Sequence, residues 1–331
     1  MAQDPLMKAG NVEILQNQSR GTEKPVPLFQ KEADDTMEAF QLENEVLSVR
    51  ILPKRGGKIA SIYSKKEKFE LLYQPRNGYP ALKAGMPFSE GDASGFDDVF
   101  PSMGETYQGL YTVHFLNLPD HGEIWTSEMS VDNASNRSIL LSCKGNVLPY
   151  EYRKQIVLDG RTVKLMIDIR NTGKKPLPLV WVCHCLMRLE EDTVFEFQQE
   201  DKRIFCLPGC TYPSKDALET VIDDPAYRFL VPPPDGYMMK FYFQCPVTVG
   251  QCAAYYPTSG IKAEMRFDPA YLPWLGFWIT TGGYRSERNF AFEPATAYFD
   301  TWTEAEKMVR LPLIAPGKET HIQMEISLLP G

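Results

Sequence analysis

The chain has 331 residues and a formal net charge of −8, from 35 lysines and arginines against 43 aspartates and glutamates. This balance argues against a non-specific nucleic-acid binder or a basic membrane-surface helix, because both need a basic face. The chain is 43% hydrophobic and has no apolar run near the roughly 18 residues of a membrane span, so we expect a globular protein with neither nucleic-acid nor membrane partners.

Residues 1–38 are polar, with interspersed glycine, proline and charges, and we expect them to form an N-terminal extension. Residues 46–52 and 58–63 read as two strands joined by a turn, which predicts a hairpin. Similar strand patterns recur to the end of the chain, separated by turn signals. These strands are predicted at Tyr111–Leu116, Ser138–Cys143, Tyr150–Val157, Thr162–Ile169, Leu179–Leu189, Met238–Phe243, Ala253–Tyr256, Leu275–Thr280, Phe290–Phe292 and His321–Leu328.

Helical periodicity is brief and clearest at Ser214–Val221. Aromatic residues make up 12% of the chain and there are 26 prolines, a composition that favours strands and turns over helices. Because strands do not alternate with helices, a doubly wound or TIM-barrel fold is disfavoured. We predict an all-β protein with large antiparallel sheets and few short helices, in which residues 39–331 form a single domain.

Seven cysteines in so long a chain do not suggest a disulfide framework. The first residues lack the basic start and apolar run of a secretory signal. We therefore expect a cytoplasmic protein, with an exported protein whose signal has been removed as the alternative.

His184 lies in the apolar run 180–187, where alternation puts Val180, Val182, His184 and Leu186 on one face and Trp181, Cys183, Cys185 and Met187 on the other. An imidazole in such surroundings can have its pKa tuned for acid–base chemistry, although it can equally be a hydrogen-bonded core histidine. Cys183 and Cys185 face away from His184, so a zinc site is not expected there.

Glu293 ends the apolar strand pattern 289–292 just before Pro294, and a carboxylate beside a buried strand needs a partner or an altered pKa. The alternative is an ion-paired residue at the rim. His121 belongs to the turn-rich segment 118–123, where Gly122 would let the backbone approach a ligand closely; an ordinary exposed turn is the simpler interpretation.

Three aspartates and a tryptophan are further candidates. Asp97 and Asp98 lie among aromatic residues in a predicted loop, 94–101, where a solvated turn is the commoner explanation. Asp268 and Trp278 belong to an aromatic-rich segment. Aromatic faces beside carboxylates suit a sugar, although most rings serve core packing. No nucleophile-elbow, phosphate-loop, metalloprotease or dinucleotide-binding motif is present, and we expect no cofactor and no metal.

Taken in order, several segments resemble the galactose mutarotase-like (aldose 1-epimerase) superfamily, over roughly residues 40–330. They are Arg55-Gly56-Gly57-Lys58-Ile59-Ala60-Ser61-Ile62, Gly95-Phe96-Asp97-Asp98-Val99-Phe100-Pro101, Asp120-His121-Gly122, Trp181-Val182-Cys183-His184, Phe292-Glu293-Pro294-Ala295-Thr296 and Leu313-Ile314-Ala315-Pro316-Gly317-Lys318. The resemblance implies a β-supersandwich with a shallow sugar cleft. It also implies roles for the matching residues: His184 as catalytic acid, Glu293 as catalytic base and His121 as a sugar-binding residue, with Asp268 as a possible ligand of the hydroxyl groups.

By this resemblance, ionised Glu293 takes the proton of the anomeric hydroxyl while protonated His184 donates to the ring oxygen. The ring opens, the aldehyde rotates and reclosure gives the other anomer. Because one residue must hold a proton and the other must not, activity is expected to fall on both sides of a near-neutral optimum.

Two departures indicate a divergent branch. Relatives that act on sugar phosphates carry a basic residue shortly after the histidine-glycine pair, where this chain has Glu123-Ile124-Trp125, so we expect a non-phosphorylated sugar unless Arg76, Arg285 or Arg288 substitutes. Cys183 stands where galactose mutarotases have asparagine. The alternative functions are a non-catalytic carbohydrate-binding or sensing protein, and glycoside cleavage by two carboxylates such as Asp98 and Glu293. We expect a monomer or homodimer.

Overall fold

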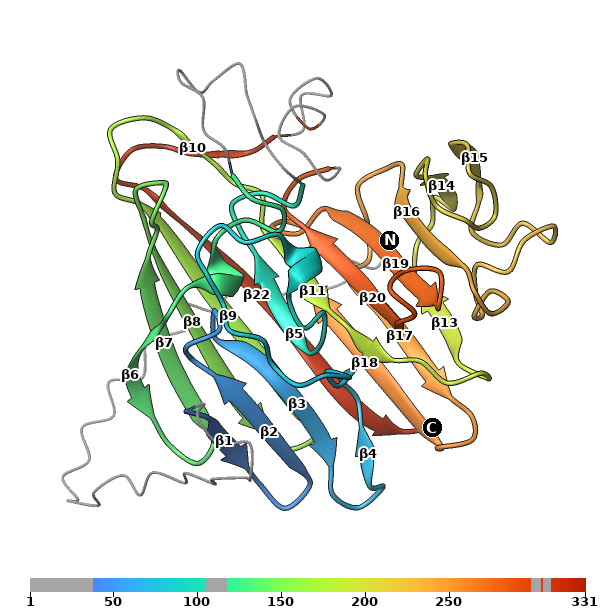
Figure 1. Cartoon of the computed structure of the whole chain (residues 1–331), viewed down its shortest axis with the longest axis horizontal. Helices are drawn as coiled ribbons and strands as arrows, with labels where there is room; N and C mark the ends of the chain where they lie inside the picture. The colour runs from blue at the N-terminus through green and yellow to red at the C-terminus, as the bar shows by residue number, and fades with distance from the viewer. Residues whose placement is uncertain (1–37, 105–117, 299–304, 306–310) are drawn as a thin grey trace, which may run out of the picture.

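The computed structural model describes residues 38–104, 118–298, 305 and 311–331. Antiparallel strands dominate this part of the chain (Figure 1), and the 3₁₀ turns Phe88–Glu90 and Ile124–Thr126 are short. The predicted all-β class is therefore confirmed. No helix within these described ranges is long and apolar enough to cross a membrane.

Within the described residues, the first of two large sheets has twelve strands and carries the predicted histidine and glutamate. Two short strands join it at the side: β4 (Phe69–Glu70) pairs with β3, and β12 (Met187–Arg188) pairs with β20. The main path runs in the order β1 (Phe40–Glu43), β2 (Leu47–Leu52), β3 (Lys58–Ser64), β5 (Phe96–Val99), β11 (Val182–Cys185), β20 (Arg288–Ala295), β19 (Trp274–Thr281), β16 (Met238–Phe243), β14 (Arg203–Cys206) and β15 (Leu218–Val221).

The second large sheet has eight strands in the part of the chain that the structure describes, and a separate two-stranded sheet there joins β10 (Leu177–Pro178) to β21 (Leu313–Ile314). The longest strands lie here, and their alternating burial shows that one face is covered. The order is β13 (Val194–Phe197), β17 (Gln251–Tyr256), β18 (Ile261–Phe267), β22 (Glu319–Pro330), β9 (Thr162–Asn171), β8 (Tyr150–Asp159), β7 (Ser138–Lys144) and β6 (Ser130–Ala134).

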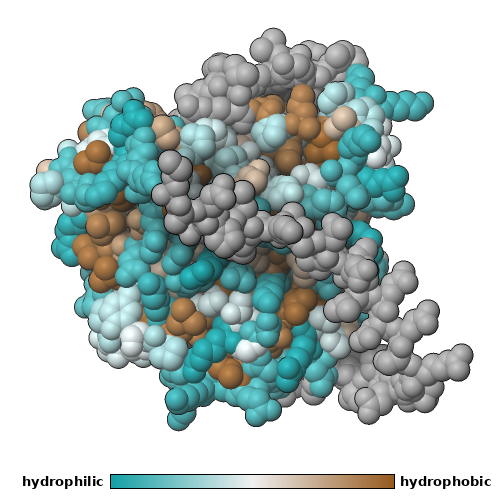
Figure 2. Space-filling model, turned by 180° about the vertical axis from the view of Figure 1, so that it is seen from behind, coloured by the Kyte–Doolittle hydropathy of each residue, from teal (hydrophilic) through white to brown (hydrophobic). Residues whose placement is uncertain are grey.

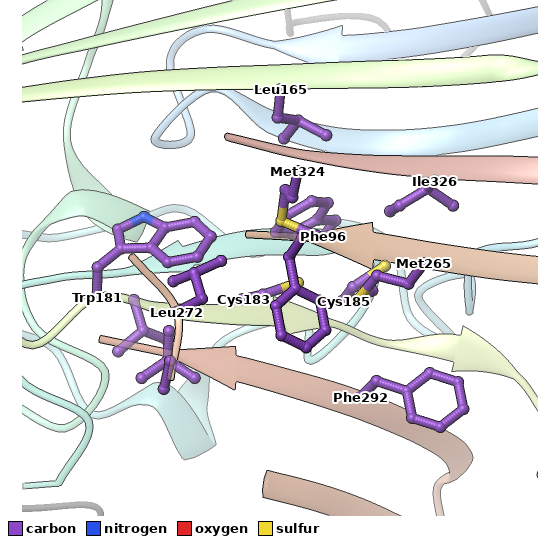
Figure 3. Close-up of a cluster of buried hydrophobic side chains, with 14 of the residues drawn as sticks. Phe96, Leu165, Trp181, Cys183, Cys185, Met265, Leu272, Phe292, Met324 and Ile326 are labelled. Atoms are coloured by element: carbon purple, nitrogen blue, oxygen red, sulfur yellow. The ribbon is translucent and has the colours of Figure 1, made fainter. Parts of the chain in front are cut away.

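The hydrophobic core lies between the two large sheets. Figure 3 shows Trp181, Cys183 and Cys185 of the β11 region packed with side chains of the second sheet, among them Met265 and Met324. The indole Nε1 of Trp181 donates to the Tyr152 hydroxyl at 2.9 Å, which satisfies its buried donor. The predicted alternation is confirmed over 183–187, where Cys183, Cys185 and Met187 join this core while His184 and Leu186 line the opposite face. It is wrong for Val180 and Val182, which also pack into the core. On the reverse side (Figure 2), hydrophilic side chains predominate among the described residues and the hydrophobic ones form separate areas.

Most predicted strands are present, including the hairpin of β2 and β3. The helix predicted at Ser214–Val221 is wrong, because Leu218–Val221 forms β15 and pairs with β14. A helix of about two turns is marginal by itself, whereas an edge strand gains ladder hydrogen bonds. The loop predicted at 94–101 is also wrong, since it contains β5, a buried central strand. The predicted strand Tyr111–Leu116 and nearly all of the predicted extension lie outside the described residues.

Candidate functional site

A cavity of about 170 Å³ lies on the face of the twelve-stranded sheet that is turned away from the core, over strands β11, β20, β19 and β16. It brings together four of the seven side chains that the sequence singled out: His121, His184, Trp278 and Glu293. Others that line it were not predicted, among them Phe88, Tyr284, Asn289, Lys240 and Glu287.

His184 reaches the cavity from the middle of β11, where its backbone pairs with Asp97 of β5. The residue is only 5% exposed, and its ring lies edge-on to Phe88 and His121, with ring centroids 5.1 and 4.7 Å away. Burial lowers the pKa of His184 well below its usual 6.5, and the positive charges of His121, Lys240 and Lys58 lower it further. This direction disfavours the protonated His184 that the resemblance implies near neutral pH.

His121 lies in a tight turn at the wall of the cavity, and its ring stacks on Phe88 with centroids 3.7 Å apart. Gly122 has a φ of +68°, and a Cβ built on it would lie 2.2 Å from the carbonyl oxygen of Phe100. Only glycine fits at this position, because the backbone of Phe100 leaves no room for a Cβ. The sequence interpretation that Gly122 makes room for a ligand is therefore corrected. The Nδ1 atom of His121 lies 3.1 Å from Asp120 Oδ1.

Glu293 lies in β20, directly opposite Gly276 of β19. It is 1% exposed, and its Oε2 lies 3.2 Å from Nζ of Lys240 in β16. A Cβ built on Gly276 would lie 3.1 Å from that same oxygen, so the glycine leaves the space that the carboxylate occupies. Glu293 is thus buried and ion-paired at once, as a carboxylate in this setting must be.

The remaining wall offers polar groups on an aromatic surface. Trp278 Nε1 donates to Asn289 Oδ1 at 3.3 Å, and the Trp278 ring meets Tyr284 edge-on with centroids 5.5 Å apart. Glu287 accepts a hydrogen bond from the Tyr73 hydroxyl, and burial together with this bond raises the pKa of Tyr73 to about 12. An aromatic wall with amide and carboxylate oxygens can hold a molecule that has both apolar and hydroxyl-bearing faces.

The structure does not bring the three predicted aspartates into this cavity. Asp98 faces the core, where its carboxylate is 2.8 Å from Lys154 Nζ. Asp268 follows β18 and accepts the backbone N–H of Ala270 at 2.8 Å. Their predicted role in sugar binding therefore finds no support here, and neither does glycoside cleavage by Asp98 with Glu293.

Asp97 shares the sheet face of His184, but Lys58 holds its carboxylate at 2.8 Å. The same ammonium lies 2.7 Å from Asp92, which also pairs with Arg55 at 3.2 Å. Two buried carboxylates thus compete for one lysine. Burial and the nearby charge of Asp92 together raise the pKa of Asp97 to about 6, against the opposing effect of Lys58.

This raised pKa predicts a pH-dependent stability. A folded-state pKa of about 6 exceeds the unfolded value of 3.8, so the folded protein binds more protons between these values. The free energy of unfolding should therefore fall as the pH rises from about 4 to 6, by up to about 3 kcal/mol from this group. Urea unfolding of the wild type and Asp97→Asn across this range should show the decline reduced in the variant. If the free energy of unfolding changes equally with pH in both proteins, the raised pKa of Asp97 is contradicted.

Lys240 is one of the cavity residues that sequence reasoning missed. It is the charged residue in the otherwise apolar or aromatic strand Met238–Phe243, and this exception could have marked it. In the part of the chain that the structure describes, no group of three or more histidine, cysteine or acidic side chains is arranged to hold a metal ion.

The architecture is that of the galactose mutarotase-like proteins, as the sequence motifs predicted. Solved structures with this fold include a galactose mutarotase related enzyme from Lactobacillus acidophilus, 16% identical, with a TM-score of 0.67 over 88% of this chain and 97% of that one. A galactose mutarotase-like protein from Lactobacillus casei is 13% identical, with a TM-score of 0.69 over 88% and 100%. The aldose epimerase homologue from C. elegans is 14% identical, with a TM-score of 0.60 over 89% and 99%. No protein-family model and no curated protein matches the sequence itself.

Proposed function

We propose that this protein is an aldose 1-epimerase-like isomerase that interconverts the anomers of a non-phosphorylated sugar. The observation that carries the proposal is the convergence of His184 and Glu293, from two paired strands, on one small cavity. Two further predicted residues, His121 and Trp278, line the same cavity. The epimerase and mutarotase names of the structural neighbours agree with this function.

Glu293 is the general base of the proposed reaction. Its carboxylate takes the proton of the anomeric hydroxyl, an acidic group of the cavity gives a proton to the ring oxygen, the bond between the anomeric carbon and the ring oxygen breaks, and an open-chain hydroxyaldehyde forms. Rotation about the adjacent carbon–carbon bond presents the other carbonyl face, and ring closure gives the other anomer. His184, His121 and Asn289 supply hydrogen bonds to the sugar oxygens, while the Trp278 ring supports an apolar face.

The charges around the cavity favour an uncharged sugar. The arginines that could have bound a phosphate have other partners: Arg76 donates to Ser286 O at 2.6 Å, Arg285 to Gly91 O at 3.2 Å and Arg288 to Asp235 at 2.6 Å. After the histidine-glycine pair, Glu123 is buried and accepts two backbone N–H groups.

Exchange NMR of anomer interconversion over a panel of aldoses tests the proposal. We expect the protein to accelerate interconversion of at least one neutral aldose, and its 6-phosphate to be a poorer substrate. If the protein binds sugars without accelerating interconversion of any, the alternative of a carbohydrate-binding or sensing protein holds instead. Acceleration that is stronger for the 6-phosphate would contradict the substrate class.

A further inference from the structure

The ion pair between Lys240 and Glu293 forms part of the cavity wall. Lys240 pairs in register with Trp278 of β19, so both side chains lie on the cavity face. The lysine reaches over β19 to Glu293 of β20, and Gly276 between them adds no side chain to block the contact. The ammonium also lies 5.5 Å from the centre of the Tyr242 ring. The lysine side chain is 13% exposed and lines the cavity, so a bound molecule can contact it.

His184 is poorly placed to hold a proton for donation. An imidazolium needs an acceptor at each nitrogen, and the described residues offer no hydrogen-bond partner to the buried Nδ1. Its ring neighbours are Phe88 and His121, which supply no negative charge. A neutral imidazole can still donate a hydrogen bond, but it is a weak acid.

We propose that Lys240, rather than His184, is the proton donor to the ring oxygen of the sugar. This inference rests on the proposed function and adds a catalytic residue to it. In the step, Glu293 takes the proton of the anomeric hydroxyl and the ammonium of Lys240 gives one to the ring oxygen. The bond between the anomeric carbon and the ring oxygen breaks as the carbonyl forms. The products are the open-chain hydroxyaldehyde, a neutral carboxylic acid and a neutral amine.

The geometry of the pair suits this step. The anomeric oxygen and the ring oxygen are bonded to the same carbon, so a base and an acid in direct contact can reach both together. The proton gained by Glu293 can return to Lys240 across the same 3.2 Å contact, which restores the ion pair without a proton from solvent. Turning a buried ion pair into a neutral pair also avoids leaving an isolated charge in the cavity.

Substitutions at Lys240 distinguish a donor from a group that only positions Glu293. Lys240→Arg keeps the positive charge beside Glu293, but a guanidinium does not release its proton in proteins. Lys240→Met removes the charge and keeps much of the side-chain length. We expect both variants to lose about 10²–10³-fold in kcat, with KM changed only a few-fold. Lys262→Met is the matched control, because Lys262 pairs with Glu196 at 2.6 Å in the other sheet.

The pH profile provides an independent measurement. Among the described residues, the titratable side chains that line the cavity or lie against Lys240 include His121, His184, Cys210, Tyr242, Tyr284, Glu287 and Glu293. An ammonium donor keeps its proton where an imidazolium has lost its own, so kcat of the wild type should be flat from about pH 7 to 9. This replaces the fall above neutral pH that the resemblance implies for a histidine donor. A protonated His184 would instead give a tenfold fall for each pH unit across this range.

The outcomes separate this inference from the proposed function. If the wild type accelerates no anomer interconversion, both fail. If the wild type is active and Lys240→Met stays within about threefold of it, only the donor assignment fails. Activity of Lys240→Arg near that of the wild type would assign Lys240 a positioning role and overturn the inference. Folding of each variant is checked by its thermal unfolding and its sugar affinity.

Discussion

Replacing Glu293 by glutamine should reduce kcat for anomer interconversion by about 10²–10⁴-fold, the usual contribution of a positioned general base. Glutamine keeps the shape of the side chain over Gly276 but cannot accept the anomeric proton. The sugar affinity should change only a few-fold, since an amide can still hydrogen-bond to hydroxyl groups. Exchange NMR gives the rate, and a direct titration gives the affinity.

The matched control for Glu293→Gln is Glu196→Gln, which breaks the corresponding pair with Lys262 outside the cavity. This control should leave kcat unchanged. A double-mutant cycle of Glu293→Gln with Lys240→Met adds a further test, because two residues that act in one step are strongly non-additive. If Glu293→Gln keeps more than about a third of the wild-type kcat, Glu293 is not the general base.

Local patterns were enough to mark His184 and Glu293 as candidates, while the family resemblance implied their roles. A strand alternates its side chains with a period of two, so the orientation of His184 against Trp181 and Cys183 follows from the sequence once the strand is recognised. Glu293 was marked by an apolar strand that runs into a carboxylate and a proline. These signals require no knowledge of which strands are neighbours.

Lys240 and the aspartates could not be placed in this way, because their partners are distant in sequence. Lys240 meets Glu293 only because β16 and β20 flank β19. The Phe96–Val99 segment has two adjacent carboxylates and reads as a loop, yet Lys58 and Lys154 stabilise them in a buried strand. Tertiary ion pairs there override local propensity.

Replacing Lys154 by methionine should lower the free energy of unfolding by about 3–5 kcal/mol, because it leaves the buried carboxylate of Asp98 without its counter-charge. Lys154 is 0% exposed and occupies an inward-facing position of β8, among Tyr152 and Ile156. Its ammonium lies 2.8 Å from Asp98 of β5 and donates to Gly57 O at 3.1 Å, so it connects the two large sheets. Urea unfolding of the variant measures the loss.

Part of the free energy of unfolding lost in Lys154→Met should be recovered when the charge of Asp98 is removed as well. Asp98→Asn combined with Lys154→Met leaves no net charge in the core, and the double variant should be more stable than the sum of the single changes allows. Lys164→Met, which breaks the exposed pair with Asp159 in the same sheet, should cost a small fraction of that loss. Because β5 pairs with β11, which carries His184, a loosened β5 should also reduce the anomer interconversion proposed for this cavity. Equal destabilisation by Lys154→Met and Lys164→Met would show that the buried pair does not hold the sheets together.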